Sequence, residues 1–217
     1  MTAALEKSRP ASRRDPADQG PPSSNRARLV AHARRLFAER GFADVSVDEI
    51  AAAASLTKGA VYYQFRDKTD LFRAACESVL KDIALEVNLA GRALNSPKLE
   101  ELATGAPRMF DAYGSQEARR LLLIEGPAVL GFDKWMDLLN PMSPCMIRTG
   151  LDHWVNAGLI PADQAETLSH LLFGAFIQGA LRVAGAADPA AADAEVRQAA
   201  ETLVRGFMAG REVLARA

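Results

Sequence analysis

Three helix start signals lie close together between residues 46 and 71, and they constrain the fold of this chain more than any other feature. Ser46 and Glu49 form a capping box, in which the Ser46 hydroxyl accepts from the Glu49 amide while the Glu49 carboxylate reaches back to the Ser46 amide. This box predicts a helix to about Ala54. Thr57 is placed to cap a short helix over residues 58–64, and Asp67 is placed to cap a long one. Two short helices joined by a tight turn have the spacing of a helix-turn-helix, whose second helix lies in the DNA major groove.

The residues of this segment divide into an apolar set and a polar set. The apolar set can form the small core that fixes the angle between the helices: Val47, Ile50, Ala51, Ala54, Leu56, Val61 and Phe65. The polar set consists of cations and hydrogen-bond donors suited to phosphates and base edges: Lys58, Tyr62, Tyr63, Gln64 and Lys68. The second helix is therefore predicted to carry a DNA-binding surface.

Helical patterns also flank this segment. A helix from about Asn25 is expected to end at Gly41, with Arg34 and Arg35 on its solvent-facing side. The long helix after Asp67 has apolar residues at four-residue steps, and Gly91 is expected to end it.

The C-terminal part of the chain continues the helical pattern. Helices are expected over residues 145–157, from about Asp163 to Ala184, and along a final apolar stripe that reaches Leu214. No segment shows a convincing strand pattern, so the expected fold is all-α. The expected divisions are a disordered arm over 1–23, a helix-turn-helix domain over 24–71, and a helical effector-binding and dimerisation domain over 72–217.

Composition excludes several classes of protein. Two cysteines are too few for a disulfide scaffold or a four-thiolate zinc site, and no metal-ligand spacing occurs. The chain has no apolar run long enough to span a bilayer and no signal-peptide core, so we expect a cytoplasmic protein without membrane contact. The net charge of −1 excludes nucleic-acid binding by bulk charge, yet residues 1–71 hold 12 Lys and Arg against 9 Asp and Glu, and the rest hold 14 against 18. A basic N-terminal third on an acidic body is consistent with a DNA-binding head.

At residues 28–71 the sequence resembles the DNA-binding head of the TetR family of bacterial transcriptional regulators. The elements LFAERGF, S-V-x-x-I-A, T-K-G-x-V-Y-Y-x-F and D-K-x-x-L occur in order and at the family's spacing, and LLLIEGPAVLG in the C-terminal part is also similar. The resemblance implies DNA contacts for Ser46, Thr57, Lys58, Gly59, Tyr62, Tyr63, Gln64 and Lys68. Three departures concern the operator sequence and the turn. Gln64 replaces a frequent His, and Ala60 replaces a frequent Thr or Ser, which removes one possible phosphate donor. Ser55 replaces the usual turn glycine, which predicts a slightly strained or differently shaped turn.

The resemblance also implies a ligand pocket among the C-terminal helices and a dimer formed through the last two long helices. The aromatic and methionine residues favour a hydrophobic or aromatic small molecule, although the same residue types also suit an ordinary core. The expected pocket residues are Phe110, Tyr113, Glu125, Trp135, Met136, Met146, His153, Trp154, Phe173 and Phe176. The expected dimer residues are Leu171, Leu172, Gly174, Ala175, Gly179, Leu203 and Phe207.

The sequence therefore predicts a homodimeric transcriptional regulator, most simply a repressor that leaves a palindromic operator when a small effector binds. No enzyme activity, metal or cofactor is expected, because Cys145 and His153 would lie about 12 Å apart on a helix and no oxyanion motif accompanies them. Two alternatives stay open. One is a ligand-independent dimeric DNA-binding protein, and the other is an all-α small-molecule binder or enzyme with a vestigial head.

Overall fold

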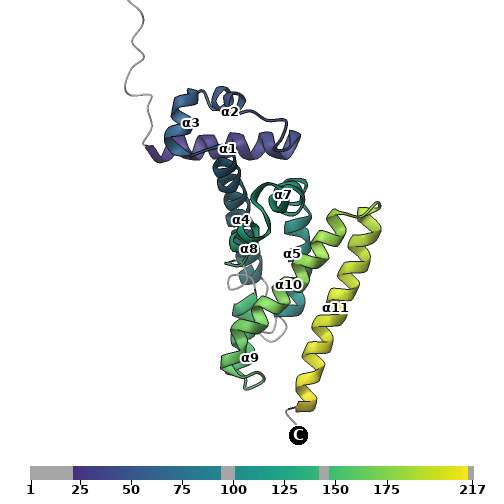
Figure 1. The fold of residues 1–217 in the computed structure, drawn as a ribbon. Helices are drawn as coiled ribbons and strands as arrows, with labels where there is room; N and C mark the ends of the chain where they lie inside the picture. The colour runs from purple at the N-terminus through teal and green to yellow at the C-terminus, as the bar shows by residue number, and fades with distance from the viewer. Residues whose placement is uncertain (1–21, 94–100, 142–146, 215–217) are drawn as a thin grey trace, which may run out of the picture.

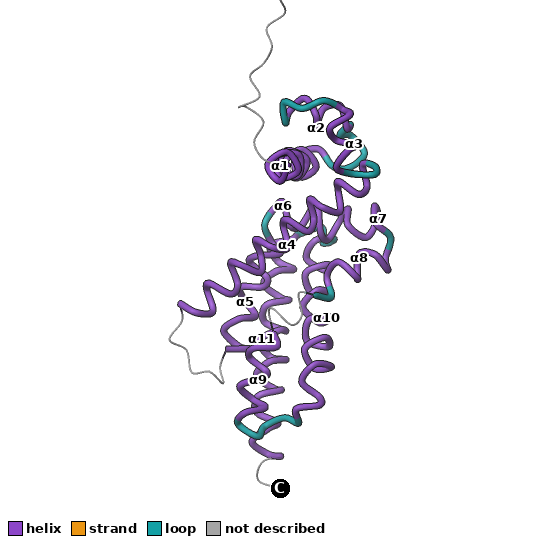
Figure 2. The backbone as a smooth tube through the Cα atoms, turned by 90° about the vertical axis from the view of Figure 1, so that its left-hand side faces the viewer, coloured by secondary structure: helices purple, strands orange, loops and turns teal. Residues whose placement is uncertain are grey.

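The computed structural model describes residues 22–93, 101–141 and 147–214, and all regular structure within these ranges is helical (Figure 1). A head of three helices stands at one end of an elongated body, and α4 runs from the head into the body (Figure 1 and Figure 2). The α-helices are α1 Pro22–Arg40, α2 Val47–Ala53, α3 Lys58–Gln64, α4 Lys68–Ala93, α5 Glu101–Gly114, α6 Gln116–Ala118, α7 Gly126–Leu130, α8 Phe132–Leu139, α9 Thr149–Asn156, α10 Ala165–Ala184 and α11 Pro189–Leu214. A π-helix, η3, spans Arg119–Glu125, and a 3₁₀ turn, η5, spans Ala162–Gln164. The all-α prediction is confirmed.

Local capping sets the helices of the head where the sequence predicts them. Both halves of the Ser46 capping box form, Thr57 accepts from the Ala60 amide, and Asp67 accepts from the Asp70 amide at the start of α4. Gly41 follows the last residue of α1 with a φ of +91°, a conformation that favours glycine. The predicted starts of α2, α3 and α4 are therefore confirmed to within one residue.

A compact aromatic cluster joins the head to α4. Phe37 and Phe72 are fully buried, and the rings of Phe37, Phe42 and Phe72 pack at centroid distances of 5.3 to 5.7 Å. Helix α4 contacts α1 on the head side and α5, α6 and α7 on the body side, and the buried apolar residues form one continuous cluster. The predicted domain boundary after residue 71 thus lies inside α4, four residues from its start.

The body is built around an antiparallel pair of long helices. Helices α10 and α11 lie side by side, and α5 packs against both of them and against α4 (Figure 1 and Figure 2). The predicted end of α10 at Ala184 is confirmed, and Pro189 occupies the first position of α11, where its missing N–H costs no hydrogen bond. No helix of the described ranges has the length and apolar character needed to cross a membrane.

Two expectations about helix boundaries need correction or restriction. Gly91 does not end α4, which continues to Ala93, because one glycine inside a helix costs only about 1 kcal/mol. For the helix expected over residues 145–157, Cys145 and Met146 lie outside the described residues, and α9 covers Thr149–Asn156. Its predicted stop is confirmed, since Gly158 follows with a φ of +70°.

Ser55 lies at the strained point of the turn between α2 and α3. Its φ is +52°, and it is the one non-glycine residue among those described with positive φ. The Leu56 amide donates to the Ala51 carbonyl at 2.9 Å and the Ser55 amide donates to the Ala52 carbonyl at 3.0 Å, which is the Schellman pattern at a helix end. The position after such a helix end usually holds glycine because a Cβ is strained there.

We predict that Ser55→Gly raises the free energy of unfolding by about 0.5–1 kcal/mol. Removing the Cβ relieves about 1–2 kcal/mol of strain, which is partly offset by the larger backbone entropy of glycine in the unfolded chain. Urea unfolding followed by far-UV circular dichroism measures the change. Ser55→Ala keeps the Cβ and should show no gain; an equal gain in both variants would contradict the strain at this turn.

Candidate DNA-binding surface and ligand cavities

Helix α3 lies in the head at one end of the molecule (Figure 1), and much of its surface is exposed to solvent. The Tyr62 and Tyr63 side chains are 50% and 86% exposed, although large aromatic residues are usually buried. Lys58 and Gly59 are exposed in the first turn of α3, and Gln64, the last residue of the helix, is half-buried. The interior of the short helix is held by Val61, which is 1% exposed. The division predicted for this helix, with Val61 inward and the tyrosines outward, is confirmed.

The cations of this surface already have partners within the head. The Lys58 ammonium lies 2.9 Å from the Asp48 carboxylate, and this hydrogen bond raises the pKa of Lys58 above its ordinary value. The Lys68 ammonium lies 4.3 Å from the centre of the Phe42 ring and 3.4 Å from the Ala43 carbonyl oxygen. These contacts are weak enough for an incoming phosphate to compete with them.

The amide of Ser46, by contrast, is occupied. It donates to the Glu49 carboxylate at 2.8 Å, and the Ser46 hydroxyl donates to the same oxygen at 2.8 Å. The backbone hydrogen bond from Ser46 and the ion pair with Arg40 lower the pKa of Glu49 to about 2. A phosphate near Ser46 would therefore meet a carboxylate that stays ionised, which makes this residue the weakest of the predicted DNA contacts.

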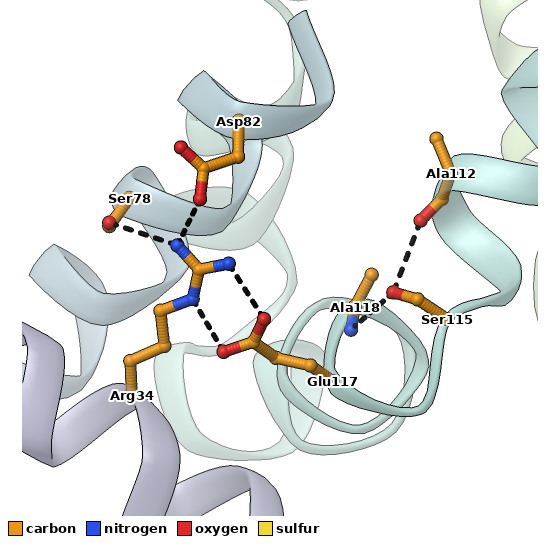
Figure 3. Close-up of polar contacts among 7 residues, drawn as sticks. All are labelled: Arg34, Ser78, Asp82, Ala112, Ser115, Glu117 and Ala118. Atoms are coloured by element: carbon orange, nitrogen blue, oxygen red, sulfur yellow. Dashed lines mark hydrogen bonds and ion pairs between the residues drawn. The ribbon is translucent and has the colours of Figure 1, made fainter. Parts of the chain in front are cut away.

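Arg34 corrects one expectation from the sequence, because it does not lie on a solvated helix face. Its guanidinium contacts the Glu117 carboxylate through two nitrogens, one of them at 2.7 Å, and it also pairs with Asp82 and donates to Ser78 (Figure 3). The hydrogen bonds to Glu117, and then the one to Asp82, raise the pKa of Arg34 above its ordinary value. Arg34 thus joins α1 of the head to α4 and to α6 of the body.

The short helix that carries Glu117 is itself held in place by a cap. Ser115 accepts from the Ala118 amide at 3.2 Å, and its hydroxyl donates to the Ala112 carbonyl at the end of α5 (Figure 3).

A second contact joins the head to η3, and it gives Glu125 a place different from the one expected. The Glu125 carboxylate accepts from the Phe42 amide at 2.6 Å and lies 3.4 Å from Arg120, which donates to the Glu39 carbonyl at the end of α1. A Cβ on Gly41 would lie 2.5 Å from a Glu125 oxygen, so only glycine permits this approach. Glu125 is expected from the sequence to orient an effector, but it belongs to the junction between head and body and does not line either cavity of the C-terminal helices described below.

Two cavities among the C-terminal helices take up some of the residues expected to bind a ligand. A cavity of about 460 Å³ lies between α5, η3, α10 and α11, and Phe110 and Tyr113 line it. A groove of about 360 Å³ between α10 and α11 is lined by Phe110 and Phe176, whose rings pack edge to face at 5.6 Å.

The other residues expected in a ligand pocket lie elsewhere in the body. Trp135, Trp154 and Phe173 are buried, and Trp135 donates to the Leu122 carbonyl at 2.7 Å. Met136 and His153 are half-buried and line neither cavity, and Met146 lies outside the described residues.

The face of α10 and α11 that is expected to form a dimer is partly apolar and exposed. Leu171 of α10 is 65% exposed and Leu203 of α11 is 48% exposed, and Gly174 and Ala175 of α10 are also exposed. The expectation for Leu172 is corrected, because this residue is buried within the protein and is only 8% exposed. Gly179 is half-buried at the groove, where an added Cβ would lie 2.8 Å from the Val196 side chain. The side chain of Phe207 is not among the side chains that the structure describes.

Comparison with known proteins decides the family. Residues 29–75 match the model of bacterial regulatory proteins of the tetR family, and residues 100–207 match the tetracyclin repressor-like C-terminal domain. The chain belongs to the TetR family. It is a DNA-binding transcriptional regulator, because both of its domains match those of such proteins.

Individual relatives of this TetR-family protein agree in sequence and in fold. The transcriptional regulator AcrR of Shigella flexneri is 28% identical over 71% of this chain and 75% of its own length. A TetR-family regulator of Pectobacterium atrosepticum, known from its crystal structure, is 28% identical with a TM-score of 0.76, covering 89% of this chain and 97% of its own. The crystal structure of RolR in complex with resorcinol has a TM-score of 0.63 and covers 90% of this chain and 95% of its own. Its sequence is 22% identical, so this likeness supports only the fold.

Several residues of these sites had no signal in the sequence. Glu117 and Arg120 join the TetR-family head to its body, and Arg119 and Arg197 line the cavity. Each of them has a partner far away along the chain, so neither capping rules nor helical periodicity could predict these contacts. One feature of the sequence could have drawn attention to this segment. Arg119 and Arg120 directly precede the apolar run LLLI, and Glu125 directly follows it.

We predict that Arg34→Ala lowers the free energy of unfolding by about 1–2 kcal/mol, because it leaves two carboxylates at the junction without their common partner. Arg35→Ala is the matched control on the same helix. It removes only an exposed ion pair with Glu39 at 3.6 Å and should change stability by less than about 0.5 kcal/mol. Urea unfolding compares the two, and equal effects would contradict the role of Arg34 in joining head and body.

Proposed function

We propose that this protein is a homodimeric repressor that leaves its operator when a small molecule binds among its C-terminal helices. The observation that supports this most is the position of η3, which contacts the end of α1 in the head and also forms a wall of the larger cavity. A change at this wall can reach the DNA-binding head without crossing any other element. A coupling of only about 1–3 kcal/mol changes operator affinity by about 5- to 150-fold.

In this proposal the DNA contacts come from the exposed face of α3 and from the start of α4. Tyr62, Tyr63 and Lys68 contact phosphates, while Gln64 reads a base edge, where its amide can pair with adenine. Thr57, Lys58 and Gly59 form the N-terminal turn of α3, where backbone amides and a cation favour a phosphate.

The two heads are brought together by the exposed apolar strip on α10 and α11. Leu171, Gly174, Ala175 and Leu203 lie on this strip, which borders the groove between the two helices. Small residues allow the partner's helices to approach closely, and the leucines supply apolar area. A symmetric pair of heads about 34–36 Å apart would read the two halves of a palindrome on one face of DNA.

For the DNA contacts we predict different effects of phosphate-contacting and base-reading residues. The probe is the DNA that the wild-type protein selects from a random-sequence pool. Tyr62→Phe and Lys68→Ala should weaken binding at every sequence. Only Lys68→Ala removes a cation, so only this variant should reduce the steepness of log K against log salt, by about 0.9 for each phosphate that is no longer neutralised. Gln64→Ala should instead relax discrimination at one position of each half-site by about 1–3 kcal/mol.

Lys81→Ala is the control for Lys68→Ala, because Lys81 is an exposed lysine farther along the same helix. Its binding curve should match that of the wild-type protein. If Tyr62→Phe, Lys68→Ala and Gln64→Ala all bind as the wild type does, α3 is not the reading helix.

For the dimer, Leu171→Glu should convert the protein to monomers and abolish high-affinity DNA binding, since it places a charge in an apolar interface. Analytical ultracentrifugation measures the mass, and Leu85→Glu is the control because Leu85 is 59% exposed on α4, away from α10 and α11. A Leu171→Glu protein that remains dimeric would place the interface elsewhere.

A further inference from the structure

The cavity between α5, η3, α10 and α11 has two parts of different chemistry. Its volume of about 460 Å³ is in the range of sites for drug-sized molecules. Apolar side chains from all four helices form much of the wall: Phe110, Leu123, Ala180, Val183, Ala184 and Pro189. The polar side chains that also line it are the ones that decide which molecule fits.

Most of these polar side chains already have partners. Arg197 holds two carboxylates, with Asp193 at 2.6 Å and Asp111 at 2.8 Å. Ser115 is engaged with the backbone at Ala112 and Ala118 (Figure 3). One guanidinium against two carboxylates leaves this cluster with a net negative charge, and its hydrogen-bond donors are already taken.

Two of the residues that line the cavity, Tyr113 and Arg119, carry buried donors without a hydrogen-bond partner. The Tyr113 residue is 2% exposed, its hydroxyl has no hydrogen-bond partner, and burial raises its pKa above the ordinary value. Arg119 donates through one terminal nitrogen to the Ala184 carbonyl at 2.9 Å, but its buried Nε has no acceptor. Arg119 also has no carboxylate partner among the described residues. Buried donors without acceptors are costly and uncommon in folded proteins.

We propose that this cavity binds an organic acid, in which a carboxylate contacts Arg119 and Tyr113 and an apolar aliphatic or aromatic body fills the remaining space. A carboxylate supplies acceptors to both unmatched donors, and its pairing with a guanidinium is the strongest such contact. An ammonium compound would supply no acceptor to either of these two donors. An uncharged compound of the same shape would satisfy fewer donors and would bind more weakly.

The same acid has a direct route to the head, and this part of the inference rests on the proposed function. Arg119 begins η3 at the cavity, whereas Arg120 and Glu125 of η3 hold the end of α1. A π-helical segment is uncommon and occurs often at functional sites. Engagement of Arg119 by a ligand therefore acts on the element that positions the head.

The test uses the full-length protein and two acids as probes, 2-naphthoate and decanoate, each compared with its primary amide by titration calorimetry. At least one acid should bind at millimolar concentration or below, about tenfold more tightly than its amide. Arg119→Met should abolish this preference for the acid, and Tyr113→Phe should weaken acid binding about three- to tenfold while leaving amide binding nearly unchanged. Arg73→Met, which removes an exposed arginine of α4 paired with Glu77, is the control and should bind as the wild type does.

Circular dichroism and binding to the selected DNA establish that each variant is folded. Failure of both acids to bind, or an acid preference that survives in a folded Arg119→Met protein, overturns the inference. The proposed repressor function is read separately, from release of the selected DNA by the acid that binds. Acid binding without DNA release would refute the coupling and leave the site intact, whereas DNA binding without acid binding would refute the site alone.

Discussion

The end of helix α1 is held by η3, and the position of the head follows from this interaction. The Glu125 carboxylate accepts from the Phe42 amide, and Arg120 donates to the last carbonyls of α1. Such contacts satisfy backbone groups that a helix end leaves without partners. They require Gly41, whose positive φ turns the chain and whose missing side chain leaves room for Glu125. Arg34 adds a second point of contact, so the head is fixed to the body at both η3 and α6.

The distribution of charge explains how a protein of net charge −1 can be a DNA-binding regulator. Many of its arginines pair within the molecule, as Arg34 and Arg197 do, and such residues contribute to structure and offer little to DNA. The head keeps a small number of exposed donors on α3, and Lys58 among them is partly offset by Asp48. DNA affinity should then depend on a few contacts and on the spacing of the heads, because a chain without net positive charge is not attracted to DNA as a whole.

The head could be predicted from the sequence almost residue by residue, because its signals act over short distances. Ser46, Thr57 and Asp67 each bond to an amide three residues ahead, and the left-handed conformation after α1 is a property of Gly41 itself. The strained turn at Ser55 was predicted from the resemblance, because Ser55 stands where the family usually has glycine. The body was predictable only as a set of helices. Gly91 shows the limit, since the local preference of one residue against a helix is overcome by the packing of α4 as a whole.

The sequence by itself determined the all-α class, the helix-turn-helix head and the resemblance to the TetR family, since these depend on capping, periodicity and short motifs. The tertiary structure alone decided which polar residues meet. Arg34 reaches Glu117 and Phe42 reaches Glu125 across 83 residues of chain in each case, and Arg119 reaches Ala184 across 65. Contacts at such separations depend on how several helices pack together. Arg34 and Arg35, adjacent and chemically identical, differ for this reason: one joins two domains, and the other faces solvent.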